Sequence, residues 1–213
     1  MQPDLQEMKN WAVEAGEILC QKFTQRHQVR MKGKFDLVTE ADTASEALLI
    51  ERIRGRHPLD RLITEESGLL EGNGGGTWYV DPLDGTAEFI AHNGEFVIMI
   101  GLAVAGEPVV GVVYQPIDDV MYAAARGTGA YVEEFGERIR LQVSGEDDLR
   151  RFRLVVSRSH RPPMVDTIMR RMGLQRERSI GSVGLKIGLI ARGQAEFYVH
   201  PNPGTKEGDT CGP

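Results

Sequence analysis

Residues 77–89, TWYVDPLDGTAEF, place two carboxylates at the end of an apolar strand and follow them with a glycine and a threonine. Asp81 and Asp84 would repel each other at such a position unless a positive charge lay between them. Pro82 fixes the local backbone and has no N–H group, so Asp81, the Leu83 carbonyl and Asp84 can turn toward one point. Oxygen ligands of this kind suit Mg²⁺. The stretch therefore predicts a cation site.

Gly85 and Thr86 extend this prediction from a cation to a phosphate. Glycine lets the backbone approach an anion closely, and the backbone N–H groups at this point can hold a phosphate. Thr86 adds a hydroxyl group beside the same point. For DxxDG alone, a solvated turn with two surface aspartates remains an equal alternative. The spacing excludes two others: Pro82 breaks the pattern of an EF-hand loop, and the haloacid-dehalogenase phosphatases need one residue, not two, between their aspartates.

Two further acidic signals lie upstream. Glu65 and Glu66 follow the short apolar strand expected at residues 61–64, which is an unusual position for adjacent charges. Asp42 lies near the start of an expected helix, where compensation of the helix dipole is the simpler explanation. Each signal taken singly favours a structural reading, and their combination favours a functional one.

Composition limits the class of protein. The chain has 213 residues, 41% of them hydrophobic, and its net charge of −6 argues against a surface that binds nucleic acid. Its two cysteines give neither a disulfide framework nor a zinc motif. The first residues carry charges where a signal peptide would be apolar, and the longest apolar run, residues 96–106, is too short to cross a bilayer. We expect a cytoplasmic protein that holds any anionic ligand through local cations.

The pattern of apolar residues predicts two parts, an α+β part at residues 1–143 and a smaller α/β part at residues 144–213. In the first part, we expect helices at 4–24 and from the Thr39–Asp42 capping signal to about Arg54, a strand at 61–64, a flexible glycine-rich turn at 71–77, and strands at 77–80, 96–104, 109–114, 120–125 and 130–132. Short turns between the last four strands predict an antiparallel meander. In the second part, we expect a strand at 153–157, helices at 163–172 and 182–191, and a strand at 196–199.

Four motifs in this order resemble the inositol monophosphatase superfamily of metal-dependent, lithium-sensitive phosphatases: DLVTEAD (36–42), ITEESG (63–68), WYVDPLDGT (78–86) and GDTCGP (208–213). The resemblance covers nearly the whole chain and implies a layered αβαβα sandwich. Within the superfamily, VVSRSH (155–160) and the segment 181–199 look most like the 3′(2′),5′-bisphosphate nucleotidases. That branch implies removal of the 3′-phosphate of adenosine 3′,5′-bisphosphate.

The resemblance also implies a role for each motif residue. Asp42 and Thr86 would orient and deprotonate the attacking water. Two or three Mg²⁺ ions would be held by Glu65, Asp81, the Leu83 carbonyl, Asp84 and, for a second ion, Asp209. The substrate would be contacted by Gly85, Thr86, Ser157, His160, Ser182, Lys186 and Asp209, with Lys186 serving as a point charge near a second phosphate.

The sequence departs from the family pattern at its C-terminal end. Gly208 stands where relatives have a tryptophan, and the chain stops at Pro213, so we expect a truncated C-terminal part and a weakened second metal site. Hydrolysis of inositol monophosphate or fructose 1,6-bisphosphate stays open as an alternative. A degenerate, catalytically weak protein that binds metal or nucleotide is the alternative of another class. The expected partner is a small phosphate ester, not a nucleic-acid polymer or a membrane, and a homodimer is left open.

Overall fold

The computed structural model describes residues 5–25, 29–31, 37–159 and 161–199. The helices are α1 (Leu5–Phe23), α2 (Glu40–Arg56), α3 (Thr86–Ile90), α4 (Met164–Met172) and α5 (Val183–Ala191), with a short 3₁₀ helix η1 (Leu149–Arg151). The strands are β1 (Val29–Met31), β2 (Leu37–Thr39), β3 (Arg61–Thr64), β4 (Gly68–Leu70), β5 (Gly76–Asp84), β6 (Val97–Val104), β7 (Glu107–Gln115), β8 (Val120–Ala125), β9 (Gly129–Glu134), β10 (Glu137–Arg140), β11 (Arg153–Ser157), β12 (Arg176–Ile180) and β13 (Phe197–Tyr198).

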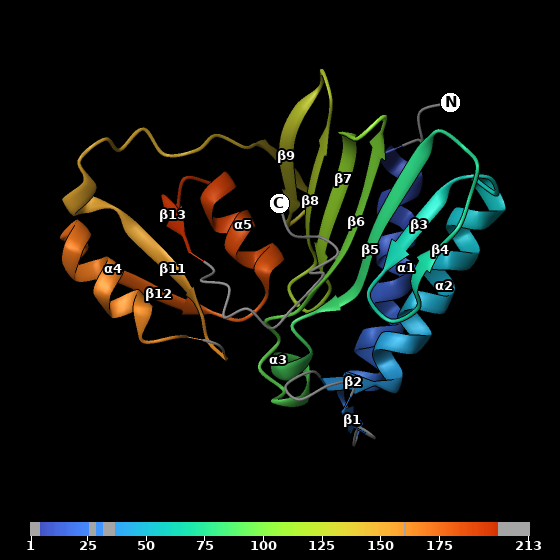
Figure 1. Ribbon diagram of the computed structural model, residues 1–213, viewed down its shortest axis with the longest axis horizontal. Helices are drawn as coiled ribbons and strands as arrows, with labels where there is room; N and C mark the ends of the chain where they lie inside the picture. The colour runs from blue at the N-terminus through green and yellow to red at the C-terminus, as the bar shows by residue number, and fades with distance from the viewer. Residues whose placement is uncertain (1–4, 26–28, 32–36, 160, 200–213) are drawn as a thin grey trace.

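The elements stack in five layers (Figure 1). Helices α1 and α2 cover one face of an eight-stranded sheet with the order β10-β9-β8-β7-β6-β5-β3-β4. Helix α5 lies between this sheet and a three-stranded parallel sheet, β12-β11-β13, and α4 covers the outer face of the latter. The predicted αβαβα sandwich is therefore confirmed.

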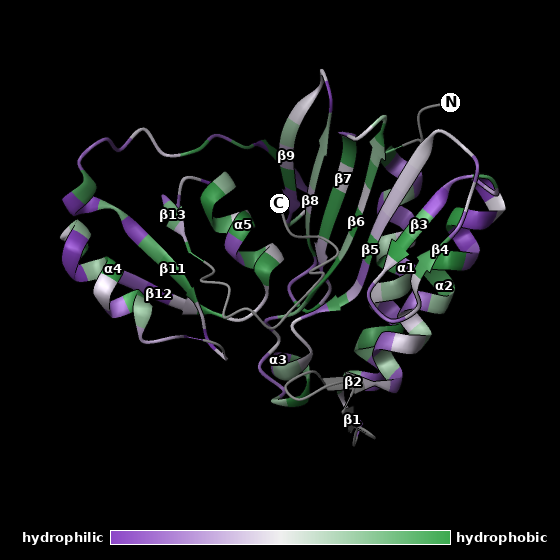
Figure 2. Cartoon of the chain, viewed as in Figure 1, coloured by the Kyte–Doolittle hydropathy of each residue, from purple (hydrophilic) through white to green (hydrophobic). Residues whose placement is uncertain are grey.

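Alternation along the strands assigns side chains to the two faces of the large sheet. On β6, Ile98 and Ile100 belong to the core beneath α1 and α2, whereas Val97 and Met99 pack with α5 and β11. Because both faces are buried, β6 reads as a nearly continuous apolar run, which Figure 2 shows in green. In α5, a Cβ atom added at Gly184 would lie 2.7 Å from Val97 Cγ2, so this glycine permits the close packing of the helix on the sheet.

Helix α2 begins with the predicted capping box. The Thr39 hydroxyl accepts a hydrogen bond from Ala41 N at 3.1 Å, and the Asp42 carboxylate accepts one from Thr39 N at 2.8 Å. Each interaction satisfies a backbone donor that the first helical turn leaves unpaired. The helix continues two residues beyond the predicted end at Arg54.

The antiparallel meander from β6 to β9 is confirmed, and β10 extends it by one strand that the sequence did not predict. Strand β12, with the sequence RERSI, was also missed, because four of its five residues are exposed and its pattern is not apolar. The short strand β4 was missed as well. Strand β12 pairs with β11 across the intervening helix α4, whereas β10 and β4 pair with the strands that directly precede them, β9 and β3. All three are short, and short segments carry little local signal for strand pairing.

The glycine-rich segment 71–77 was predicted as a flexible turn, and this prediction is wrong in part. Cβ atoms added at Gly72, Gly74 and Gly76 would each lie within 2.5 Å of Leu59 or Asp60 atoms. The glycines thus allow the segment to pack tightly on the turn before β3, where Asp60 accepts hydrogen bonds from Gly76 N and Trp78 Nε1. Their role here is close approach of two backbone segments.

The two sheets are joined by residues 141–152, which include η1. The division of the chain at residues 143 and 144 stays a prediction. Across the described ranges, no helix is both long and apolar enough to cross a membrane.

Candidate active site

Asp81 and Asp84 lie on the same face of the large sheet because β5 is irregular between them. Asp81 pairs with Met99 and Asp84 with Val97, so three steps along β5 match two steps along β6. Without this extra residue, side chains three positions apart would point to opposite faces. Strand β5 was predicted to end at residue 80 but continues to Asp84, and the irregularity accommodates Pro82 within it.

Glu65 lies beside this pair, at the end of the neighbouring strand. Strands β3 and β5 are parallel with Thr64 opposite Val80, and Glu65 N donates a hydrogen bond to Val80 O at 3.2 Å. Burial raises the pKa of Asp81 well above its usual range, and the charges of Glu65 and Asp84 raise it further, as does a hydrogen bond with the Glu65 carboxyl group. The three predicted carboxylate ligands therefore interact electrostatically at one edge of the sheet.

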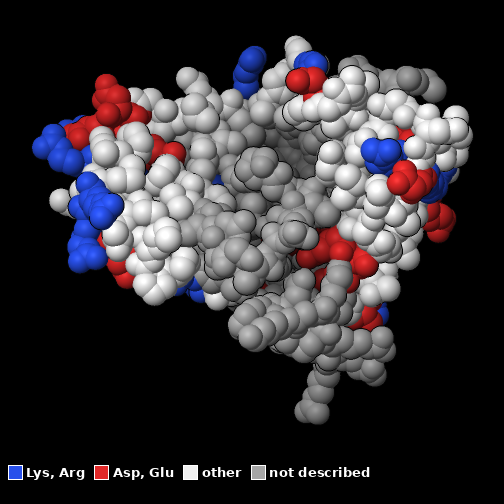
Figure 3. All heavy atoms as spheres, viewed as in Figure 1, with Lys and Arg blue, Asp and Glu red and all other residues white. Residues whose placement is uncertain are grey.

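The described residues contain no group of three or more His, Cys, Asp or Glu side chains in a metal-binding arrangement. Two of the expected ligands are directed at protein donors: Asp81 Oδ1 accepts from Leu83 N at 3.0 Å, and Asp84 Oδ2 accepts from Gly184 N at 2.7 Å. The chemistry of the set nonetheless fits Mg²⁺, because all its donors are oxygen atoms and its carboxylates repel one another. In Figure 3, Asp and Glu side chains gather on the face where β3 ends.

Asp42 and Thr86 meet directly, although 44 residues separate them. Asp42 is fully buried at the start of α2, and its Oδ1 accepts a hydrogen bond from Thr86 Oγ1 at 3.1 Å. Its Oδ2 accepts from the Thr39 hydroxyl at 2.6 Å, so both oxygens have donors. Burial raises the pKa of Asp42, whereas the hydrogen bonds from Thr39 and Thr86 act in the opposite direction. Thr86 Oγ1 also lies 3.3 Å from Leu83 O, the predicted carbonyl ligand.

Gly85 connects the two aspartates to α3 in a conformation that requires glycine. Its φ of +108° is rarely adopted by L-residues, and an added Cβ would lie 2.9 Å from Glu95 O. The turn therefore places Thr86 two residues after Asp84, at the first position of α3. The predicted substrate contact at Gly85 stays a prediction.

Two functional candidates escaped the sequence analysis, and both lie on the buried face of α2. Ser45 is fully buried and donates to Pro82 O at 3.0 Å. Glu46, 2% exposed, accepts hydrogen bonds from Glu66 N at 2.7 Å and from Ser67 N at 2.9 Å. The sequence did carry a signal for them: positions 42, 45, 46, 49 and 53 lie on one face of a helix, so the polar residues at 42, 45 and 46 share the core-facing side with apolar residues at 49 and 53.

Ser182 and Lys186 are buried around the start of α5. The Ser182 hydroxyl donates to Asp84 Oδ2 and accepts from Leu185 N at 3.1 Å, which makes it the N-cap of α5. Lys186 is 1% exposed, and its ammonium group donates to the carbonyls of Ile180, at 3.4 Å, and Gly181. The structure thus places Ser182 at the predicted metal ligand, and the contacts of both residues with a substrate stay predictions.

The other predicted substrate residues divide into two groups. Ser157 ends β11 and is partly buried. His160 and Asp209 lie outside the described residues, as does Gly208, so their predicted roles stay predictions.

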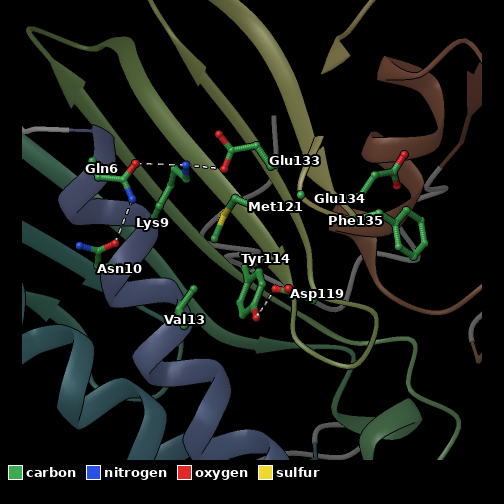
Figure 4. A pocket seen from close by; sticks show the side chains of 11 residues that line it. Gln6, Lys9, Asn10, Val13, Tyr114, Asp119, Met121, Glu133, Glu134 and Phe135 are labelled. Carbon is green, nitrogen blue, oxygen red and sulfur yellow. Dashed lines mark hydrogen bonds and ion pairs between the residues drawn. The ribbon is translucent and has the colours of Figure 1, made fainter. Parts of the chain in front are cut away.

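A surface cavity of about 290 Å³ lies away from these residues, between α1 and the β9–β10 hairpin (Figure 4). Its lining contains none of the predicted site residues. Polar groups in it are paired within the protein: Lys9 with Glu133, and the Tyr114 hydroxyl with Asp119 at 3.0 Å. The predicted chemistry is therefore concentrated at the ends of β3 and β5, not in this cavity.

Comparison with known proteins agrees with this geometry. The model of the inositol monophosphatase family matches residues 1–213. The chain is 38% identical over 194 residues to the 3′(2′),5′-bisphosphate nucleotidase CysQ of Escherichia coli K12. This alignment covers 89% of the present chain and 77% of CysQ. The chain is 42% identical over 144 residues to inositol monophosphatase 2 of Solanum lycopersicum, covering 65% of this chain and 52% of that protein.

Solved structures show the same fold. The suhB protein of Bartonella henselae superimposes with a TM-score of 0.81 at 28% identity, covering 91% of this chain and 76% of that one. The IMPase of Thermotoga maritima superimposes with a TM-score of 0.78 at 27% identity, covering 89% and 73%. The layered sandwich, the order of the acidic motifs and the match over the whole chain lead to one conclusion. The chain belongs to the inositol monophosphatase family of metal-dependent phosphatases.

Proposed function

We propose that this protein is a Mg²⁺-dependent phosphomonoesterase that hydrolyses the 3′-phosphate of adenosine 3′,5′-bisphosphate. The observation that carries the proposal is the position of Thr86 Oγ1, 3.1 Å from Asp42 Oδ1 and 3.3 Å from Leu83 O. One hydroxyl group thereby lies between a buried carboxylate and a predicted metal ligand. This is the arrangement needed to orient a water molecule for attack on a phosphorus atom.

Thr86, Asp42 and the backbone after Gly85 would each have a separate role in the reaction. The Thr86 hydroxyl donates to Asp42, so its oxygen lone pairs are directed away from that carboxylate and can accept a hydrogen bond from the attacking water. As the proton of the water moves to Thr86 Oγ1, the hydroxyl proton of Thr86 would move to the Asp42 carboxylate. Asp42 is held by Thr39 and cannot turn away without breaking the capping box. The backbone N–H groups that follow Gly85 would bind the phosphate.

Glu65, Asp81, Asp84 and the Leu83 carbonyl would hold Mg²⁺. When bound, Mg²⁺ supplies positive charge that stabilises the developing charge on the phosphoryl oxygens and makes water more acidic. The same charge would favour the ionised form of Asp81, whose pKa is raised by burial and by repulsion from Glu65 and Asp84.

The choice of substrate rests on the similarity to CysQ and on the C-terminal motifs. Inositol 1-phosphate is the second candidate, favoured by the 42% identity to the tomato inositol monophosphatase over 144 residues. The acidic motifs are expected in both groups, so substrate choice depends on the loops that surround them. The cytoplasm is the proposed location.

The test is phosphate release from adenosine 3′,5′-bisphosphate, inositol 1-phosphate and fructose 1,6-bisphosphate, each with Mg²⁺ and with EDTA. We expect Mg²⁺-dependent release with the highest kcat/KM for the nucleotide. Preference for either of the other two substrates would replace the nucleotide assignment. The absence of release from all three would favour the degenerate, ligand-binding alternative.

Thr86→Val removes the hydroxyl group and keeps the branched shape of the side chain. We expect kcat to fall by about 100-fold or more, because general-base assistance typically contributes that much. Asp118→Asn is the matched control, since Asp118 is exposed and binds only the nearby Gln115 amide among the interactions described for it. Equal activity of both variants would refute the role of Thr86.

A further inference from the structure

Glu95 contacts two loops that lie far from it in the sequence. Its Oε2 accepts hydrogen bonds from Arg158 Nε at 2.9 Å and from Gly181 N at 2.7 Å. Its Oε1 accepts from Arg158 Nη2 at 2.5 Å, and its backbone carbonyl accepts from Ser182 N at 3.3 Å. The residue therefore binds the loop after β11 through a bidentate ion pair and the loop after β12 through its side chain and its backbone.

The same carbonyl also packs on the turn formed by Asp84, Gly85 and Thr86, the catalytic turn of the proposed phosphatase. A Cβ atom added at Gly85 would lie 2.9 Å from Glu95 O, and one added at Gly181 would lie 3.0 Å from it. Both glycines are thus needed for Glu95 to fit between them. Gly181 also packs against the Glu88 side chain: an added Cβ atom would lie 2.3 Å from Glu88 Cγ, so a larger residue would clash at this position.

The two loops that Glu95 holds follow the carboxyl ends of parallel strands. In open α/β sheets, ligands bind in the crevice outside these ends. Strands β11 and β12 are parallel, and their first loop residues include Arg158, Gly181 and Ser182. A substrate larger than a phosphate group would extend from Gly85 and Thr86 toward these loops, whereas a small ester would contact the catalytic turn alone.

We propose that Glu95 is a positioning residue: through Arg158 and Gly181 it fixes the loops after β11 and β12 relative to the catalytic turn, and these two loops discriminate between substrates. The proposal rests on the phosphatase function proposed above. Glu95 does not contact the reacting atoms, so its loss should leave the chemistry on a small ester intact. The loss of Glu95 should weaken discrimination in favour of a substrate that contacts both the catalytic turn and the loops after β11 and β12.

The test compares two substrates in the full-length chain, adenosine 3′,5′-bisphosphate and p-nitrophenyl phosphate. Glu95→Gln retains an acceptor for Gly181 N but loses the ion pair, and Glu95→Ala loses both. We expect kcat/KM for the nucleotide to fall about 10-fold for Gln and 100-fold for Ala, mainly through KM, with kcat/KM for p-nitrophenyl phosphate within about 3-fold of wild type. Arg158→Lys keeps the charge without the bidentate geometry and should resemble Glu95→Gln.

Glu107→Gln is the control, because it breaks an exposed ion pair with Arg126 far from these loops. Equal losses on both substrates, or no loss on either, would overturn the proposal. Binding of adenosine 3′,5′-bisphosphate by titration calorimetry separates the two proposals. If wild type binds the nucleotide without hydrolysing it, the phosphatase proposal fails, and the affinities of the Glu95 variants still decide the role of Glu95. If wild type does neither, both proposals fail.

Discussion

Glu196→Gln should destabilise the protein at neutral pH and leave it almost unchanged in acid. Glu196 joins the start of β11 to the segment before β13: its Oε2 accepts from Arg153 N at 2.6 Å and from Arg153 Nε at 3.2 Å. The side chain of Glu196 is 5% exposed. The hydrogen bonds from the Arg153 guanidinium are the largest cause that lowers the pKa of Glu196 to about 2, against an ordinary value of 4.5.

The magnitude follows from this difference in pKa. At about 1.4 kcal/mol per pKa unit, it corresponds to about 3 kcal/mol of stability. Arg153 is 39% exposed, so screening by solvent reduces the expected effect to about 1–2 kcal/mol. Because the folded-state pKa lies below the unfolded one, this stability is fully present above pH 4.5. It is lost as the pH falls toward 2.

Urea unfolding followed by circular dichroism, at several pH values between 7 and 3, measures the difference between Glu196→Gln and wild type. We expect a difference of about 1–2 kcal/mol that stays constant from pH 7 to about pH 4.5 and narrows from there to pH 3. Glu107→Gln, which breaks an exposed pair, should stay within about 0.5 kcal/mol of wild type throughout. A difference for Glu196→Gln that is the same at every pH would show that the loss comes from packing and not from the charge.

Three further changes test the catalytic turn and its supports. Glu46→Ala removes the acceptor for the Ser67 N–H and should raise the Mg²⁺ concentration for half-maximal activity about 10-fold, with a smaller rise for Glu46→Gln. An unchanged Mg²⁺ requirement would show that Glu46 does not support the metal ligands. Gly85→Ala should lower the free energy of unfolding by about 1–3 kcal/mol in urea titrations, because its φ is positive and Glu95 O is close, and a neutral result would contradict that geometry. Asp84→Asn should abolish Mg²⁺-dependent phosphate release while circular dichroism stays unchanged, and retained activity would refute the metal assignment.

The sequence was most informative where structure depends on neighbours along the chain. The Thr39–Asp42 capping box was predicted from spacing alone, since both partners lie within one helical turn. The meander followed from short turns between apolar strands. The family motifs indicated the layered fold, which the five layers of the structure confirm.

Tertiary structure decided the features that join distant residues. The hydrogen bond between Asp42 and Thr86 exists because α2 packs on β5 with Asp42 on its buried face. The irregularity in β5 turns Asp81 and Asp84 to one side, and its register is visible only against β6. Strand β12 forms from exposed, charged residues because β11 supplies its hydrogen-bonding partner.

The residues that hold the loops of the site in place could not be predicted from the sequence, for the same reason. Glu46 and Glu95 look like ordinary charged residues in the sequence, and only the fold brings their carboxylates to backbone N–H groups of loops 20 to 86 residues away. Motif chemistry is local, so the sequence by itself predicts which residues carry it, and those assignments stay predictions. The positions of those residues depend on burial and hydrogen bonding between separate elements, which only the packed chain provides.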